Sequence, residues 1–197
     1  GSLALQQNTT ASNNTGIGYS ALRYNTTGQY NTALGGNALE ANTTASNNVA
    51  VGKNALLSNT TGTRNIAVGS YALDANTTAS DNTALGYQAL SANTTGFSNT
   101  AVGKDALALN TTGESNVALG NFTLDANTEG DKNTGLGRGS LSGNTIGSNN
   151  TAVGYQSLFA NTTGVGHVAI GVHASDAITT NNYTTAVGYN VLTQNTA

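Results

Sequence analysis

The sequence lacks four residue types: cysteine, proline, methionine and tryptophan are all absent from its 197 residues. Without cysteine there is no disulfide framework. Charged residues are also scarce, at 8 % of the chain against roughly 25 % in typical soluble domains. The net charge is −3, and the six basic residues are spread along the whole chain. Such a distribution cannot form a patch that follows phosphates, so we expect no nucleic acid partner.

Long apolar runs are missing as well. No run approaches the ~18 residues that a membrane span needs, so we expect no membrane contact within this fragment. No signal peptide is visible at the start. The first two residues, Gly1 and Ser2, look like a cloning remnant, yet GSLAL at Gly1–Leu5 also matches GSYAL at Gly69–Leu73. Both interpretations of these two residues stay open.

What the chain has instead is a strict repeat of 17 residues without insertions or deletions. Repeats start at Asn14 and at every seventeenth residue as far as Thr184, and the residues before Asn14 keep the same register. We number the positions of each coil from 1 to 17, beginning at these starts. Residues 1–197 therefore form a single repeat domain, and 197 residues divided by 17 gives about 11.6 coils. Because the chain begins and ends in mid-coil, we expect a fragment of a longer fibre.

Several coil positions are nearly invariant. Position 5 is glycine and position 13 is threonine in every coil that starts from Asn14 onward, and position 4 is always Val, Leu or Ile. Position 3 is Ala or Gly, position 9 is Leu except at Ser175, and position 12 is Asn except at Ile178. Helical repeats are longer and rich in helix formers. Positions 1–4 and 7–9 instead resemble two short strands, the glycine allows a bend, and Asn-Thr-Thr-Gly at positions 12–15 predicts a turn in which Asn and Gly tolerate positive φ. The pattern predicts an all-β fold, a parallel β-solenoid with 17-residue coils.

The charged residues indicate which positions face solvent. All fifteen fall at positions 6, 7, 10, 14, 16 or 17, and an unpaired charge is costly to bury. We therefore predict a core built from positions 3, 4, 8 and 9. Such a core holds few and mostly small side chains in each coil, so we expect a homo-oligomer that buries a second apolar row against partner chains.

Three segments suggest a family. NVAVG at Asn48–Gly52, NIAVG at Asn65–Gly69 and HVAIG at His167–Gly171 resemble the YadA-like head repeat of trimeric autotransporter adhesins, and similar coils occur in phage tail-fibre-like surface fibre proteins. The N-x-A-V-G core of this resemblance covers the whole chain, although the family's coil is shorter than 17 residues. The resemblance implies a left-handed parallel β-roll, a homotrimer around one axis, and an extracellular location on the cell surface (outer membrane) or on a virion.

The function expected from this resemblance is a structural or adhesive segment of a trimeric surface fibre, an adhesin head or stalk. Such a segment mediates or presents attachment to a cell or matrix surface, with a protein or glycan of a host, prey or matrix as ligand. The alternative is an antifreeze-type solenoid that orders water or ice with its Thr columns. The sequence contains no calcium-binding Asp repeat, phosphate-cradling glycine loop or nucleophile triad. We therefore expect no enzyme, no catalytic residue and no cofactor.

Other residues allow a functional and a structural interpretation. His167 and His173 are the only histidines, and three copies near a threefold axis would offer metal ligands; we expect instead that they replace Asn and a variable residue without binding a metal. The Asn column at position 12 predicts a ladder of stacked amides. Asn-Thr-Thr, as at Asn25, Asn42 and Asn59, is also a glycosylation sequon. The tyrosines at position 6 are either ordinary surface residues or a surface for stacking on sugars or a partner.

Overall fold

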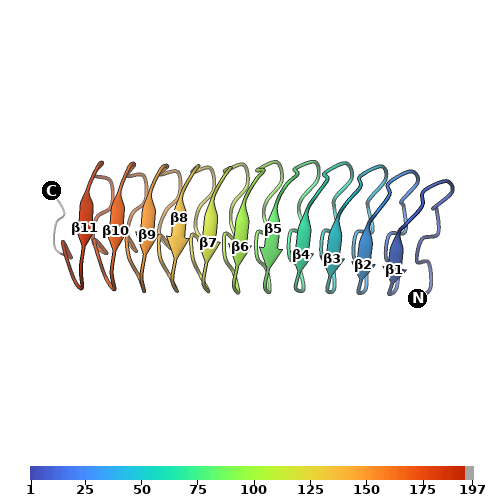
Figure 1. The fold of residues 1–197 in the computed structure, drawn as a ribbon, viewed down its shortest axis with the longest axis horizontal. Helices are drawn as coiled ribbons and strands as arrows, with labels where there is room; N and C mark the ends of the chain where they lie inside the picture. Colours follow the sequence, from blue (N-terminus) through green and yellow to red (C-terminus); the bar gives the residue numbers. More distant parts are fainter. Residues whose placement is uncertain (194–197) are drawn as a thin grey trace.

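The computed structural model describes residues 1–193, which form an elongated parallel β-solenoid (Figure 1). Eleven three-residue strands follow one another in chain order in a single sheet, and neighbouring strands are parallel and offset by 17 residues. The strands are β1 Thr15–Ile17, β2 Thr32–Leu34, β3 Val49–Val51, β4 Ile66–Val68, β5 Thr83–Leu85, β6 Thr100–Val102, β7 Val117–Leu119, β8 Thr134–Leu136, β9 Thr151–Val153, β10 Val168–Ile170 and β11 Thr185–Val187. The predicted β-solenoid and its 17-residue coil are confirmed. Within the described residues there is no helix capable of crossing a membrane.

Each strand occupies coil positions 2–4, and its side chains alternate between the two faces of the sheet. The Ala at position 3 points inward and is fully buried in most coils, as at Ala50 and Ala84. Positions 2 and 4 point outward because successive side chains of a strand face opposite sides. The prediction that position 4 belongs to the core is therefore wrong for the single chain: the side chain of Leu34 is 44 % exposed.

The glycine at position 5 turns the chain out of the sheet. In Gly35, Gly52 and their equivalents φ lies between 126° and 144°, a region that L side chains rarely adopt. The coils also touch here: a Cβ added to Gly35 would stand 2.5 Å from the carbonyl oxygen of Gly52 in the next coil. The predicted bend at this position is confirmed, and close backbone packing as well as φ requires glycine there.

The segment at positions 7–9 is a turn and not the second strand that we predicted. Residues at positions 7 and 9 have positive φ, as at Asn37 (58°) and Leu39 (51°). The N–H groups at positions 7 and 9 therefore point in opposite directions along the stack. The N–H of Asn37 donates to Tyr19 in the preceding coil, and that of Leu39 donates to Ala55 in the following coil. The segment therefore bonds to both neighbours without forming a strand ladder.

The interior of the solenoid has an apolar half. Columns of Ala at position 3, Ala at position 8 and Leu at position 9 make one continuous buried cluster. The first coil, which includes Gly1–Leu5, follows the same course, since Leu5 donates its N–H to Ala21 in the next coil. None of the fifteen charged residues is buried, so the predicted division between inward and solvated positions holds for the charges.

The other half of the interior is polar and consists of two buried asparagine columns. At position 12, the side-chain amide of each Asn donates to the side-chain oxygen of the Asn in the preceding coil, in nine consecutive pairs at 2.7–3.1 Å from Asn8 to Asn161. The predicted ladder is confirmed. It ends where Ile178 takes the place of Asn, and the Oδ1 of Asn161 has no partner among the described residues.

The second asparagine column is at position 1, predicted from the sequence to be the start of a strand. In the structure these asparagines are buried from Asn31 onward. The Oδ1 of Asn31 accepts the backbone N–H of Asn48 in the next coil at 3.0 Å. The Nδ2 of Asn31 crosses the coil to the carbonyl of Ala45 at 2.8 Å, and the Nδ2 of Asn42 in the first ladder donates to the same carbonyl at 3.0 Å. Two amides thus converge on the carbonyl at position 15.

The predicted turn at positions 12–15 is present, but it does not use positive φ at Asn or Gly. Neither Asn25 nor Gly28 has positive φ, and the left-handed residue on this side of the coil is at position 17, as in Tyr30 (57°). The turn is fixed instead by its side chains, because the amide of Asn25 donates to the carbonyl of Gly28 at 3.0 Å. Asn195 and Thr196, the last members of the Asn and Thr columns, lie outside the described residues.

A pair of adjacent glycines tests the backbone contact between coils. We expect Gly35→Ala to destabilise the solenoid, because its φ of 136° and the carbonyl of Gly52 oppose a Cβ. The unfavourable φ alone costs about 1–3 kcal/mol. Gly36→Ala is the control, since a Cβ there would meet nothing within 4 Å, and it should leave stability unchanged or raise it slightly. Thermal unfolding followed by circular dichroism measures both. Equal effects of the two substitutions would contradict this packing.

The core is tested within a single coil. Leu107 is fully buried and Lys104 is exposed. Leu107→Asp should cost more than the roughly 2–5 kcal/mol of a buried Leu→Ala change, because it also buries an unpaired charge. Lys104→Ala should change the melting temperature little, since an exposed ion pair such as that of Lys104 with Asp105 contributes about 0–1 kcal/mol. Similar melts for the two variants would mean that the register is wrong.

Candidate interaction face

The outward side of the sheet carries two side-chain columns, at positions 2 and 4, which we call the sheet face. Position 4 contributes an aliphatic residue from every strand, and position 2 contributes Thr, Val or Ile. Several of these side chains are well exposed, among them Ile17, Leu119, Leu136 and Ile170. Isolated exposed aliphatic residues are normal on a protein surface, but an unbroken row is a mark of an interaction site.

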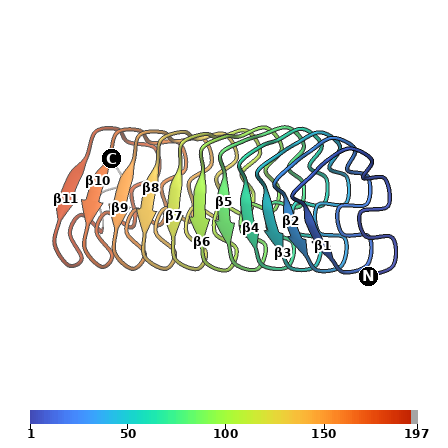
Figure 2. The ribbon, with the colours of Figure 1, turned by 45° about the vertical axis from the view of Figure 1, so that its right-hand side comes forward.

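The sheet face is narrow and uncharged. The strands line one side of the stack, and the rest of each coil returns behind them (Figure 2). Three residues of extended strand span about 10 Å, and eleven strands at a spacing of ~4.8 Å extend over about 50 Å. The face therefore covers on the order of 500 Å². No charged residue occurs at either of its positions, so no charge in the two columns opposes its burial.

His167 lies inside the coil and not on a surface. It takes the place of Asn at position 1 and is 1 % exposed. Its backbone N–H donates to the Oδ1 of Asn150 at 2.9 Å, and its Nδ1 accepts the N–H of Thr184 at 3.2 Å, which preserves the contacts of the asparagine column. Burial lowers the pKa of His167, while a hydrogen bond with the backbone of Asn181 acts in the opposite direction. The structural interpretation of His167 fits these contacts.

His173 lies apart from His167, at coil position 7. We call positions 6–11, which follow the glycine bend, the return segment. Its Nδ1 is 3.1 Å from the carboxylate of Asp176, and its ring packs edge-on against Tyr155 with the ring centroids 5.3 Å apart. Residues 1–193 contain no group of three or more His, Asp or Glu side chains that could hold a metal ion. His167 is buried, so it cannot meet its symmetry copies at a threefold axis. The altered coil from His167 to Tyr183 differs mainly in its interior, where Ser175 and Ile178 are also buried.

The tyrosines at position 6 are exposed, as predicted. Along this edge, cations and aromatic rings from successive coils pack against one another. Lys53 lies over the ring of Tyr71 at 5.6 Å from its centroid, and Arg138 lies over Tyr155 at 5.8 Å. Tyr71 in turn packs edge-on against Tyr87, with the centroids 6.2 Å apart. These contacts account for several of the aromatic side chains without any ligand.

The threonine column at position 13 is occupied by the backbone. The hydroxyl of Thr26 donates to the carbonyl of Thr43 in the next coil at 3.0 Å, and the same bond recurs as far as Thr162 and Thr179, at 3.1 Å. The proton of each of these hydroxyls is therefore taken up by the backbone, which leaves only the lone pairs of the oxygen for water. The sequon asparagines such as Asn25 are fully buried in the ladder, so a glycan could be attached to them only if the coil opened.

Comparisons with known proteins give no further lead: no family model, no curated protein and no solved structure matches the chain. The function is therefore argued from the geometry above.

The buried histidine predicts a pH dependence of stability. The folded pKa of His167 lies below its ordinary value of about 6.5, so the unfolded chain takes up the proton first as the pH falls. Above about pH 6.5, His167 is neutral in both states and the free energy of unfolding is not reduced. Between about pH 6.5 and the lower pKa of the folded state, the free energy of unfolding decreases as the pH falls. His167→Asn restores the residue of the other coils. Its melting temperature should fall less than that of the wild type between pH 7.5 and 5, and parallel curves would contradict the assignment.

Proposed function

We propose that this chain is a structural and adhesive segment of a homotrimeric surface fibre, located outside the cell on a cell surface or a virion. Three solenoids pack around one axis through their sheet faces, and the opposite sides point outward to present attachment sites. The observation that carries this proposal is the unbroken aliphatic column at position 4, which the single chain leaves partly exposed along all eleven strands.

The composition of the sheet face supports a second copy of the chain as its occupant. The face is as long as the solenoid itself and has the same repeat, so an identical chain in parallel can match it coil by coil. Three faces of about 500 Å² would bury about 1,500 Å² in the whole trimer, or about 500 Å² for each of its three pairwise contacts. Each contact alone is smaller than the ~1,000 Å² expected of a specific interface, so the three contacts have to form together. Burial of aliphatic side chains such as Leu85 and Val102 would also add apolar contacts to a core that consists largely of alanine.

A second candidate function uses the same face differently. Seven of the eleven residues at position 2 are threonine, so the sheet presents hydroxyl and methyl groups in a column whose members are ~4.8 Å apart where neighbouring coils both carry threonine. A free face of this kind is the surface that an antifreeze-type solenoid would use to order water. This candidate requires a monomer, because a trimer covers the face. Thermal hysteresis of a monomeric protein would support it, and the absence of hysteresis at high concentration would remove it.

Sedimentation equilibrium tests the proposed trimer. The wild type should have three times the 19.7 kDa mass of the chain. Val68→Lys combined with Leu119→Lys places charges on the sheet face and should reduce the mass to that of one chain, because each lysine would be buried unpaired between the chains. The strand itself should tolerate both changes, since these side chains are partly exposed in the monomer.

The matched control places the same two lysines two residues further on. Ser70→Lys combined with Asn121→Lys falls at position 6, where Lys53 and Lys104 already stand, and should leave the mass unchanged. A monomeric wild type, or equal masses for the two double variants, would rule out assembly through the sheet face.

A further inference from the structure

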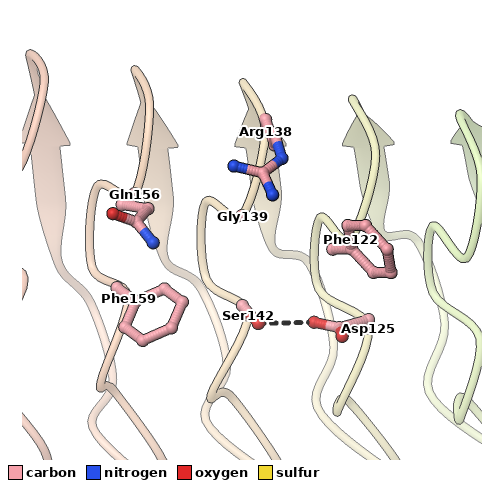
Figure 3. A pocket seen from close by; sticks show the side chains of 7 residues that line it. All are labelled: Phe122, Asp125, Arg138, Gly139, Ser142, Gln156 and Phe159. Atoms are coloured by element: carbon pink, nitrogen blue, oxygen red, sulfur yellow. Dashed lines mark hydrogen bonds between the residues drawn. The ribbon is translucent and has the colours of Figure 1, made fainter.

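One coil is hollowed on the side of the solenoid away from the sheet. Position 7 carries a side chain in all the remaining coils, but in this coil it is Gly139. Position 10 of the same coil is the short Ser142. The coils on both sides keep large side chains at these positions. The result is a cavity of about 260 Å³ open to solvent, which we call the notch (Figure 3). Strands β7–β9 pass behind it in the same view.

Two phenylalanines stand on opposite walls of the notch. Phe122 comes from the coil before Gly139 and Phe159 from the coil after it (Figure 3), so they lie two coils apart, or about 9.6 Å along the stack. Phe159 is 41 % exposed, and a Cβ on Gly139 would meet its ring at 3.9 Å. Phe159 therefore leaves an apolar ring surface open at the place where other coils have a side chain.

Polar side chains surround the same space. The hydroxyl of Ser142 donates to Oδ1 of Asp125 at 2.6 Å, and the backbone N–H groups of Asp125 and Ala126 also bond to this carboxylate. A carboxylate has about four acceptor sites, so that of Asp125 can accept one further bond. Partial burial raises the pKa of Asp125, and the bond from Ser142 opposes this rise. Above them, Arg138 and Gln156 face the notch from the other side (Figure 3). Hydrogen-bond donors and acceptors thus stand around the rim and not at one end.

We infer that the notch is a binding site for one neutral pyranose unit of a surface glycan. The apolar C–H face of the sugar ring packs on Phe159, and its hydroxyl groups bond to Asp125, Arg138 and Gln156 around the rim. A pyranose has hydroxyls distributed around its ring, which matches this arrangement. In a free amino acid, by contrast, the ammonium and carboxylate groups are both attached to the same carbon, so its polar groups lie at one end and do not match this rim. The inference rests on the proposed attachment function and supplies its ligand class.

The position of the notch keeps it accessible in the proposed assembly. Its residues belong to coil positions 6, 7 and 10, on the return segment, whereas the partners would cover positions 2 and 4 on the sheet face. Each trimer would then present three notches at the same height along the fibre. For a pyranose of about twelve non-hydrogen atoms in one open site, we expect a dissociation constant on the order of millimolar. Three such sites on one trimer raise its avidity for a glycan-bearing surface.

Saturation-transfer NMR on the full chain tests this inference. Methyl β-D-glucopyranoside and methyl β-D-galactopyranoside are titrated to about 50 mM, well above a millimolar dissociation constant. At least one glycoside should show saturable transfer, and Phe159→Ala should weaken it at least tenfold. Gly139→Gln should do the same by filling the notch. It should fold normally, because Gln88 and Gln156 occupy this position elsewhere with φ of 55° and 53°, close to the 67° of Gly139.

The control is Phe97→Ala, which removes an exposed phenylalanine outside the notch and should leave binding unchanged. Sedimentation of the same samples separates the two proposals, because a trimer without glycoside binding rejects the notch alone and a monomer that binds rejects the trimer alone. The inference is overturned if neither glycoside binds, if L-phenylalanine binds and neither glycoside does, or if Gly139→Gln and Phe159→Ala bind as the wild type does.

Discussion

Hydrogen bonds between buried asparagine amides run through the inside of the solenoid and link each coil to the next. The position-12 ladder joins side chain to side chain, and the position-1 column joins side chain to backbone, as in Asn42 to Asn25 at 2.8 Å and Asn48 to Asn31 at 3.0 Å. A buried amide without partners is costly. A shift of register would leave whole columns of amides unpaired, so the ladders fix the 17-residue coil more strictly than a core made of Ala and Leu could.

The features of the fold that the sequence predicted are those that depend on a single invariant residue in each coil. Glycine at position 5 implied a bend, Asn at position 12 implied a ladder, and both are present. The strand at positions 2–4 was also predicted, but its orientation was not. A column of Ala flanked by a column of Val and Leu is compatible with either face being inward, and only the alternation of the strand places Leu34 outside and Ala33 inside.

Other features had no usable signal in the sequence. Positive φ at Leu39 is invisible because leucine rarely adopts it, so Ala-Leu was interpreted as a strand. Asn31 was placed at the start of a strand and its burial was missed. The notch was missed for another reason: Gly139 is a single departure within a variable column, and its effect depends on Phe122 and Phe159, one coil away on either side. The glycines in the run RGSLSG, from Arg138 to Gly143, were the available hint.

The two sides of the solenoid have different variability, and this agrees with the functions proposed for them. The sheet face repeats the same side-chain types in every coil, which suits contact with identical chains. The return segment changes from coil to coil and carries most of the charged and aromatic residues, which suits contact with a varied surface. Fixed interior columns allow this variation, because a substitution at positions 6, 7 or 10 leaves Asn93 and its neighbours in the ladder untouched.

Native-state hydrogen exchange of the asparagine side-chain amides tests the central role of the ladders most directly. NMR resolves the Nδ2 protons of mid-stack residues such as Asn93 and Asn110, which are fully buried, from those of the exposed Asn121 and Asn182. If the ladders hold the coils together, the buried amides exchange only when the solenoid opens, as slowly as the backbone amides of β5 and β6. Exchange of Asn93 and Asn110 at the rate of the exposed pair would contradict this account.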